Sequence, residues 1–166
     1  MIKDACLMID LLKGSILDLW LQLKIETWLT DWVLRGLHPA QAEELTAYID
    51  SSRINLRIIT EDEYVKIHAL RSRSFARGLS PEDLSSIHVA QEGGMMLLAG
   101  NGILKKHAAD LSIDVQGTLW VFEKLVSSKL LPPGAAALKL TKLLECGRRL
   151  PEEECEQLLC KWRPKK

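Results

Sequence analysis

Hydrophobic and polar residues alternate along this chain with two periods, one typical of strands and one typical of helices. Residues 54–59, Ile-Asn-Leu-Arg-Ile-Ile, largely alternate, which predicts a strand with one buried face. Residues 95–99, Met-Met-Leu-Leu-Ala, are apolar throughout, which is typical of a parallel strand covered on both faces. Shorter apolar or β-branched segments predict further strands at residues 1–3, 25–28 and 113–115.

Between these strands the apolar residues recur every three or four positions, which predicts amphipathic helices. Two helix starts carry capping signals. Thr60 with Glu63 forms a capping box for a helix predicted over 61–76, and Ser80 followed by Pro81 starts the next helix. The remaining helices are predicted over 5–12, 16–23, 31–36, 39–49, 102–111, 118–127, 135–146 and 151–162.

Short strands separated by helices imply right-handed crossovers and a parallel sheet. We therefore predict an α/β protein, a three-layer α/β/α sandwich with a four- to five-stranded parallel sheet. The break at residues 132–134, Pro-Pro-Gly, separates a helical C-terminal extension from the rest. The expected organisation is an α/β domain over residues 1–130, with residues 131–166 packed on the same domain.

The composition restricts the classes of partner. The 166 residues contain 22 Lys plus Arg and 22 Asp plus Glu, so no global field attracts nucleic acid or membrane, and any nucleic-acid contact must be local. No apolar run approaches the length of a membrane span, and no signal region opens the chain, so we expect a cytoplasmic protein without a membrane partner. The four cysteines lack a metal or disulfide spacing and are predicted to be small buried hydrophobes.

Polar residues stand where the predicted strands end. Asp4 directly follows the first strand and precedes an apolar helix, and Asn101 lies in a Gly-Asn-Gly turn just past residues 95–99. Asp83 lies in the first turn of the helix before that strand, where the helix dipole alone would favour it. Ligands of open α/β sheets bind at the carboxyl ends of the strands. We therefore expect these three side chains to meet in one crevice.

The order of these segments resembles the PIN-domain family, metal-dependent ribonucleases that often act as toxins in bacterial toxin–antitoxin pairs. The opening Asp4-Ala5-Cys6 is similar to that of a PIN-like subgroup. The resemblance covers about residues 2–128. In the second half it rests on residues that follow the family's order: Asp83, Ala90, 95–98, Gly100, Leu104, Ala108 and Gly117-Thr118.

The resemblance implies a site of about four carboxylates that hold Mg²⁺ or Mn²⁺, hard cations that prefer oxygen ligands. The four positions fall at Asp4, near Gly36, at Asp83 and at Asn101, so only two of them carry a carboxylate. The loss of two negative charges weakens cation binding. Asp4 and Asp83 are therefore the predicted metal ligands, Asn101 joins them as a catalytic residue, and the activity is expected to be weakened or lost.

Two classes of function stay open. The first is a PIN-like protein of a bacterial toxin–antitoxin or related system, an Mg²⁺- or Mn²⁺-dependent endoribonuclease by lineage. The alternative is a non-catalytic RNA- or protein-binding scaffold that keeps the fold. By resemblance the partners are RNA, an antitoxin-like protein and a second copy of the chain in a homodimer. The sequence leaves open whether Glu43 or Glu44 replaces the missing acid near Gly36.

Basic residues flank the predicted site, and such a rim could hold RNA phosphates, although a solvated helix face is the simpler explanation for them. They are Arg71, Arg73, Arg77, Lys105 and Lys106. His68 is expected to be solvated. Trp32, like most of the tryptophans, is predicted to pack in the core or at an interface. No aromatic row along the sequence indicates a base-stacking platform.

Overall fold

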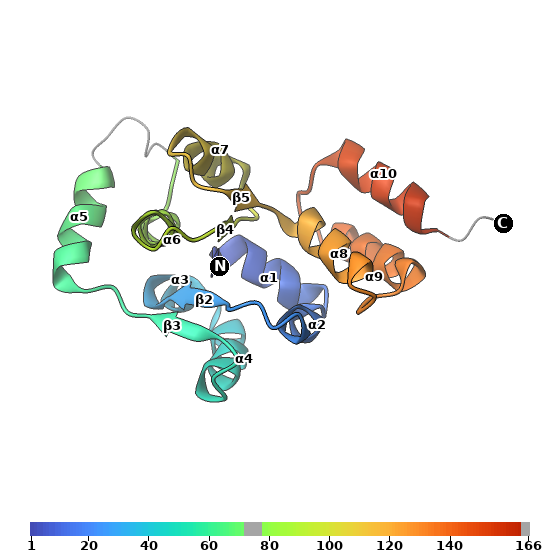
Figure 1. The fold of residues 1–166 in the computed structure, drawn as a ribbon, viewed down its shortest axis with the longest axis horizontal. Helices are drawn as coiled ribbons and strands as arrows, with labels where there is room; N and C mark the ends of the chain where they lie inside the picture. The colour runs from blue at the N-terminus through green and yellow to red at the C-terminus, as the bar shows by residue number, and fades with distance from the viewer. Residues whose placement is uncertain (72–77, 164–166) are drawn as a thin grey trace.

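The computed structural model describes residues 1–71 and 78–163 (Figure 1). Five short strands form one sheet in the order β3-β2-β1-β4-β5, and every pairing is parallel. The strands are β1 (Ile2–Lys3), β2 (Trp28–Thr30), β3 (Asn55–Arg57), β4 (Leu97–Leu98) and β5 (Val115–Gln116). The prediction of an α/β fold with a parallel sheet is confirmed.

Helices connect the strands and cover both faces of the sheet (Figure 1). They are α1 (Ala5–Lys13), α2 (Leu17–Gln22), α3 (Asp31–Gly36), α4 (Pro39–Asp50), α5 (Glu61–Arg71), α6 (Pro81–Glu92), α7 (Gly102–Asp110), α8 (Thr118–Ser127), α9 (Pro133–Glu145) and α10 (Glu152–Trp162). None of these helices has the length and apolar composition that crossing a bilayer requires, within the described part of the chain.

The sheet separates two hydrophobic cores. The larger core contains Trp20 and Phe122 from α2 and α8, and the smaller one contains Ile87 and Leu104 from α6 and α7. The C-terminal helices belong to the larger core, to which α10 contributes Trp162. Residues 133–162 therefore pack on the α/β domain, while the division of the chain at residue 130 stays a prediction.

The second strand lies three residues later than the sequence pattern indicates. The β-branched and aromatic segment 25–28 predicts a strand, but β2 begins at Trp28, which pairs with Ile2 of β1. Lys24, just before this segment, adopts a positive φ of 55° and turns the chain. Pairing with the central strand, which no local pattern encodes, therefore decides the position of β2.

The capping box predicted at Thr60 and Glu63 is present. The amide of Thr60 donates to Glu63 Oε2 over 2.9 Å, and Glu63 N donates back to Thr60 Oγ1 over 3.4 Å. These reciprocal bonds satisfy amides at the start of α5 that have no partner within the helix. The last residues of the helix predicted over 61–76 lie outside the described residues.

Candidate functional site

Asp4 lies at the carboxyl end of β1, where the sheet meets the N-terminus of α1. Its Oδ1 caps the helix by accepting a hydrogen bond from Leu7 N over 2.6 Å. The amide of Gly100, which follows β4, donates to both carboxylate oxygens at 3.2 and 3.1 Å. The Asp4 side chain is fully buried. Its position is thus fixed by the ends of two neighbouring strands.

Gly100 is required for this arrangement because the loop after β4 passes very close to α1. A Cβ at position 100 would lie 2.9 Å from Cys6 Cβ and 3.0 Å from the Leu7 nitrogen. The first contact is shorter than real Cβ atoms show, and the second is to backbone, which cannot turn aside. The absence of a side chain therefore lets the Gly100 amide reach Asp4.

Asp83 is the third residue of α6 and forms a capping box with Ser80. Ser80 N donates to Asp83 Oδ2 over 3.0 Å, and Asp83 N donates to Ser80 Oγ over 3.1 Å. The side chain is buried, with 8% of its surface exposed. The macrodipole favours an acid here, as expected from the sequence. Asp83 therefore caps α6 through both its side chain and its backbone amide, and its role as a site residue stays a prediction.

The two carboxylates influence each other. Burial and, to a smaller extent, the negative charge of Asp83 raise the pKa of Asp4 to about 7, against the hydrogen bonds from Leu7 and Gly100. Burial also raises the pKa of Asp83. Neither carboxylate has an ion-pair partner among residues 1–71 and 78–163. Two neighbouring buried acids without a counter-charge therefore occupy the carboxyl edge of the sheet.

Asn101 lies beside Asp4 and starts α7. Its Oδ1 accepts a hydrogen bond from Ile103 N over 2.9 Å, which makes it the N-cap of that helix. Its backbone amide lowers the pKa of Asp4. The structure therefore brings together Asp4, Asp83 and Asn101, as the sequence analysis expected. Each of the three side chains also caps a helix.

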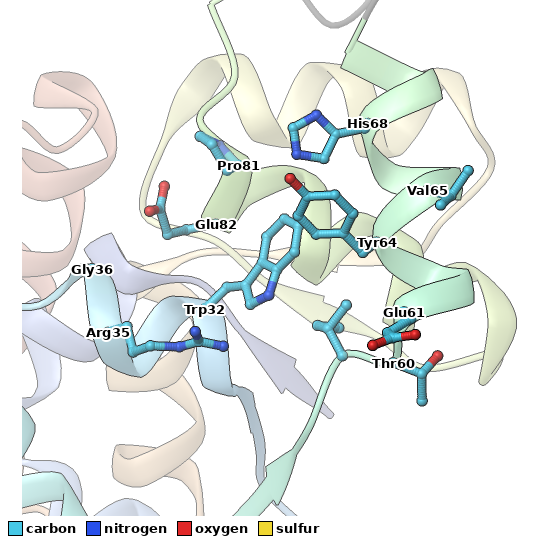
Figure 2. Close-up of a pocket in the computed structure, with 11 residues that line it drawn as sticks. Trp32, Arg35, Gly36, Thr60, Glu61, Tyr64, Val65, His68, Pro81 and Glu82 are labelled. Atoms are coloured by element: carbon cyan, nitrogen blue, oxygen red, sulfur yellow. The ribbon is translucent and has the colours of Figure 1, made fainter.

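The acid beside Gly36 is Glu82, which the sequence analysis did not place there. A Cβ on Gly36 would lie 2.9 Å from Glu82 Cγ and 3.2 Å from its Oε1, and Figure 2 shows the Glu82 carboxylate on the side of Gly36. Glu43 and Glu44 instead lie exposed on α4. Sequence spacing could not reveal this contact, because Gly36 ends α3 while Glu82 starts α6 and only the packing of these helices brings them together.

The donor set fits one hard cation better than a pair. Within residues 1–71 and 78–163, no three His, Cys, Asp or Glu side chains are grouped so that they could share a metal ion. Mg²⁺ commonly takes one or two carboxylates and completes its shell with water and phosphate oxygens. Asp4 and Asp83, buried and without a counter-charge, suit that arrangement. A two-cation site would need the further acids that Gly36 and Asn101 do not supply.

The predicted basic rim is only partly described. Arg71 and Lys106 are exposed, whereas Lys105 is half-buried and lines a cavity of about 430 Å³ with Gly100. Arg73 and Arg77 lie outside the described residues. A contact between this rim and RNA stays a prediction.

An aromatic cluster beside Glu82 is the second feature that sequence reasoning missed. Trp32 of α3 meets Tyr64 of α5 with ring centroids 5.7 Å apart, and Tyr64 meets His68 at 4.3 Å (Figure 2). The two helices are separated by 24 residues in the chain, so no aromatic row marks the cluster in the sequence. The spacing of Tyr64 and His68, one helical turn apart, was the one available signal.

Comparison with known proteins adds one positive finding. A family model described as a PIN domain matches residues 1–164. The match includes the α/β domain, all three predicted site residues and the C-terminal helices. No curated protein matches the chain. The subgroup suggested by the opening Asp-Ala-Cys therefore stays a prediction.

Proposed function

The chain belongs to the PIN-domain family, which has a nuclease-type fold, and from this premise we propose that it is a metal-dependent endoribonuclease with weakened activity. The observation that carries the proposal is the pair of buried carboxylates, Asp4 and Asp83, neither of which has an ion-pair partner within the described ranges 1–71 and 78–163. Burying unpaired charge is costly, so such a pair is expected to persist where a cation offsets the cost.

The chain's own residues prepare this site. The Leu7 and Gly100 amides hold Asp4 in one orientation, and Ser80 holds Asp83 through its Oδ2. Asp4 and Asp83 would hold a divalent cation, which would supply charge neutralisation at the scissile phosphate. Asn101 lies beside them as a neutral ligand, as proposed from the family resemblance.

The activity is proposed to be weak because the negative charge around the cation is low. Cation affinity in oxygen sites follows the number of charged ligands, and here Asn101 and Gly36 stand where the resemblance implies acids. Two carboxylates fit a single Mg²⁺ or Mn²⁺, so the attacking and leaving oxygens of the phosphodiester would not each have their own cation.

We also propose RNA, an antitoxin-like protein and a second copy of this chain as partners, and a role in a toxin–antitoxin or related system. These proposals rest on the family match alone.

The test combines cation binding with RNA cleavage. We expect Mn²⁺ or Mg²⁺ to raise the melting temperature of the protein and to permit slow cleavage of a single-stranded RNA. Asp4→Asn and Asp83→Asn should abolish both effects. Asp110→Asn, an exposed acid on α7, is the matched control and should change neither. A parent protein that binds no cation and cuts no RNA at millimolar Mn²⁺ would refute the proposal.

One observation favours the non-catalytic alternative. Oxygens of Asp4, Asp83 and Asn101 all cap helices, so helix stability alone gives a reason for each residue. RNA binding without cleavage, unaffected by Asp4→Asn, would assign the chain to this second class.

A further inference from the structure

We propose that the cavity between α3, α5 and the start of α6 binds one unpaired nucleobase of an RNA strand, with guanine preferred. The cavity has a volume of about 700 Å³ and is lined by Trp32, Tyr64, His68 and Glu82, among others (Figure 2). The inference deepens the proposed function, on which it rests for RNA as the ligand. It does not depend on a bound cation or on catalysis.

The aromatic cluster supplies surfaces on which a base can stack. The rings of Trp32 and Tyr64 meet at 71° and those of Tyr64 and His68 at 43°, so the rings do not cover one another face to face. Half of the Tyr64 surface is exposed, although an aromatic side chain of this size normally buries most of its area. Proteins that bind single-stranded RNA stack its bases on such exposed rings.

Polar groups beside the rings favour a base over an apolar side chain. The carboxylate of Glu82 and the hydroxyl of Tyr64 have no hydrogen-bond partner among residues 1–71 and 78–163. A leucine or methionine of a protein partner, bound against the rings, would leave the Glu82 carboxylate and the Tyr64 hydroxyl dehydrated and unpaired. The edge of a nucleobase can hydrogen-bond to them, so its binding does not incur that cost.

The carboxylate of Glu82 gives the cavity a preference among the bases. Guanine presents two adjacent donors, N1–H and the N2 amino group, which both oxygens of one carboxylate can accept. Uracil presents a single N3–H between two carbonyl oxygens, and these oxygens would repel the carboxylate. Gly36 leaves the space that Glu82 needs, because any side chain there would meet Glu82 Cγ at 2.9 Å.

The cavity adjoins the acidic site. Glu82 lines the cavity, and the next residue, Asp83, belongs to the pair of buried carboxylates. An RNA strand that passes the acidic site would therefore have a base within reach of the aromatic cluster, and the cavity can bind that base without a cation at Asp4 and Asp83. Arg35 lies at the rim with 70% of its side chain exposed, so its guanidinium can approach the RNA backbone while paired with Asp31.

The test is a binding measurement in EDTA, with fluorescence anisotropy of labelled UUGUU and UUUUU. We expect the parent to bind UUGUU about five-fold or more tightly than UUUUU. Tyr64→Ala should weaken the binding of UUGUU by roughly 5- to 150-fold, which is the range for the loss of one base–aromatic stack, whereas Tyr64→Phe should retain it. Glu82→Gln should remove the preference for guanine. Leu138→Ala, which truncates an exposed side chain on α9, is the control and should leave both affinities unchanged.

Three outcomes would overturn the inference. The first is that Tyr64→Ala binds UUGUU as tightly as the parent does, and the second is that the parent binds the two RNAs equally. The third is that N-acetylleucinamide displaces UUGUU while GMP does not, which would assign the cavity to a protein side chain. If Tyr64→Ala does not fold, His68→Ala provides the same test at an exposed position. A parent that binds UUGUU through Tyr64 but never cuts RNA supports this inference and refutes only the proposed function.

Discussion

The carboxylate of Asp4 accepts a hydrogen bond from the backbone amide of Gly100 over 3.1 Å, across 96 residues of the chain. The bond joins the end of β1 to the loop that follows β4, its neighbour in the sheet. It holds the candidate site together because Asn101, the next residue, lies beside the same carboxylate. Five predictions follow from this contact and from others like it.

Gly100→Ala should destabilise the protein by about 1–3 kcal/mol, the usual cost of overpacking, because the new Cβ would press on Cys6 and the Leu7 nitrogen. The urea midpoint of unfolding measures this change. Gly102→Ala is the matched control, since nothing lies within 4 Å of its Cβ position, and it should be neutral or slightly stabilising. Equal effects of the two substitutions would contradict the close approach at Gly100.

Asp4→Asn should change how stability depends on pH. The pKa of Asp4 rises from 3.8 to about 7 on folding, so between these values the folded protein holds a proton that the unfolded chain has lost. The free energy of unfolding of the parent therefore falls as pH rises through this interval, by roughly 4 kcal/mol from this group. The Asn variant lacks that decline. Urea titrations in EDTA from pH 4 to 8 measure it, and a parent curve parallel to that of Asp4→Asn would refute it.

Lys3→Met should stabilise the protein at neutral pH. Lys3 is fully buried, its Nζ lies 4.1 Å from the centre of the Trp20 ring, and no described residue accepts a hydrogen bond from it. Burial holds its pKa well below 10.5, so the unfolded chain binds a proton that the folded protein does not. The stability of the parent therefore rises toward alkaline pH.

We expect Lys3→Met to gain about 1–3 kcal/mol at pH 7, the cost of an unsatisfied buried polar group, and less at pH 10. Melting temperatures at the two pH values measure the difference. Lys13→Met, at an exposed position, should show no such pH dependence. A gain that grows toward pH 10 would contradict the assigned direction of the Lys3 pKa.

Arg148→Ala should loosen the C-terminal helices. Arg148 follows α9 and forms an ion pair with Asp10 of α1, and its Nη2 donates to the Cys6 carbonyl over 3.2 Å. Asp10 is 1% exposed and also accepts a 2.6 Å hydrogen bond from Thr118. Loss of the guanidinium leaves a buried charge unpaired, which should cost about 3 kcal/mol. Chemical denaturation compares this variant with Arg149→Ala, an exposed neighbour that should change stability little.

Gly36→Ala and Glu82→Ala should be coupled. In the parent, the new Cβ displaces Glu82 and should cost about 1 kcal/mol. In the Glu82→Ala background the same change should stabilise the protein by about 0.5–1 kcal/mol, because Ala is a better helix residue than Gly. A double-mutant cycle of unfolding free energies measures the coupling. Gly134→Ala is the control, because open space surrounds its Cβ position, and it should have the same effect in both backgrounds. If the effects of Gly36→Ala and Glu82→Ala on the free energy of unfolding simply add, the contact between Gly36 and Glu82 is refuted.

Local patterns in the sequence were sufficient to predict most helices and strands and the α/β class of the fold. Capping at Thr60 and Ser80 and the uninterrupted apolar run 95–99 are local signals, because each depends on residues a few positions apart. Asp4 and Asn101 could be placed at one edge of the sheet for a similar reason: parallel strands with right-handed crossovers present their carboxyl ends together.

Contacts between side chains of different helices could be known only from the packing of the folded domain. The contact of Glu82 with Gly36, the aromatic cluster of Trp32 and Tyr64, and the start of β2 at Trp28 all depend on how distant segments pack. Helix orientation and strand register are set by the fit of many buried side chains at once, and no short stretch of sequence contains that information.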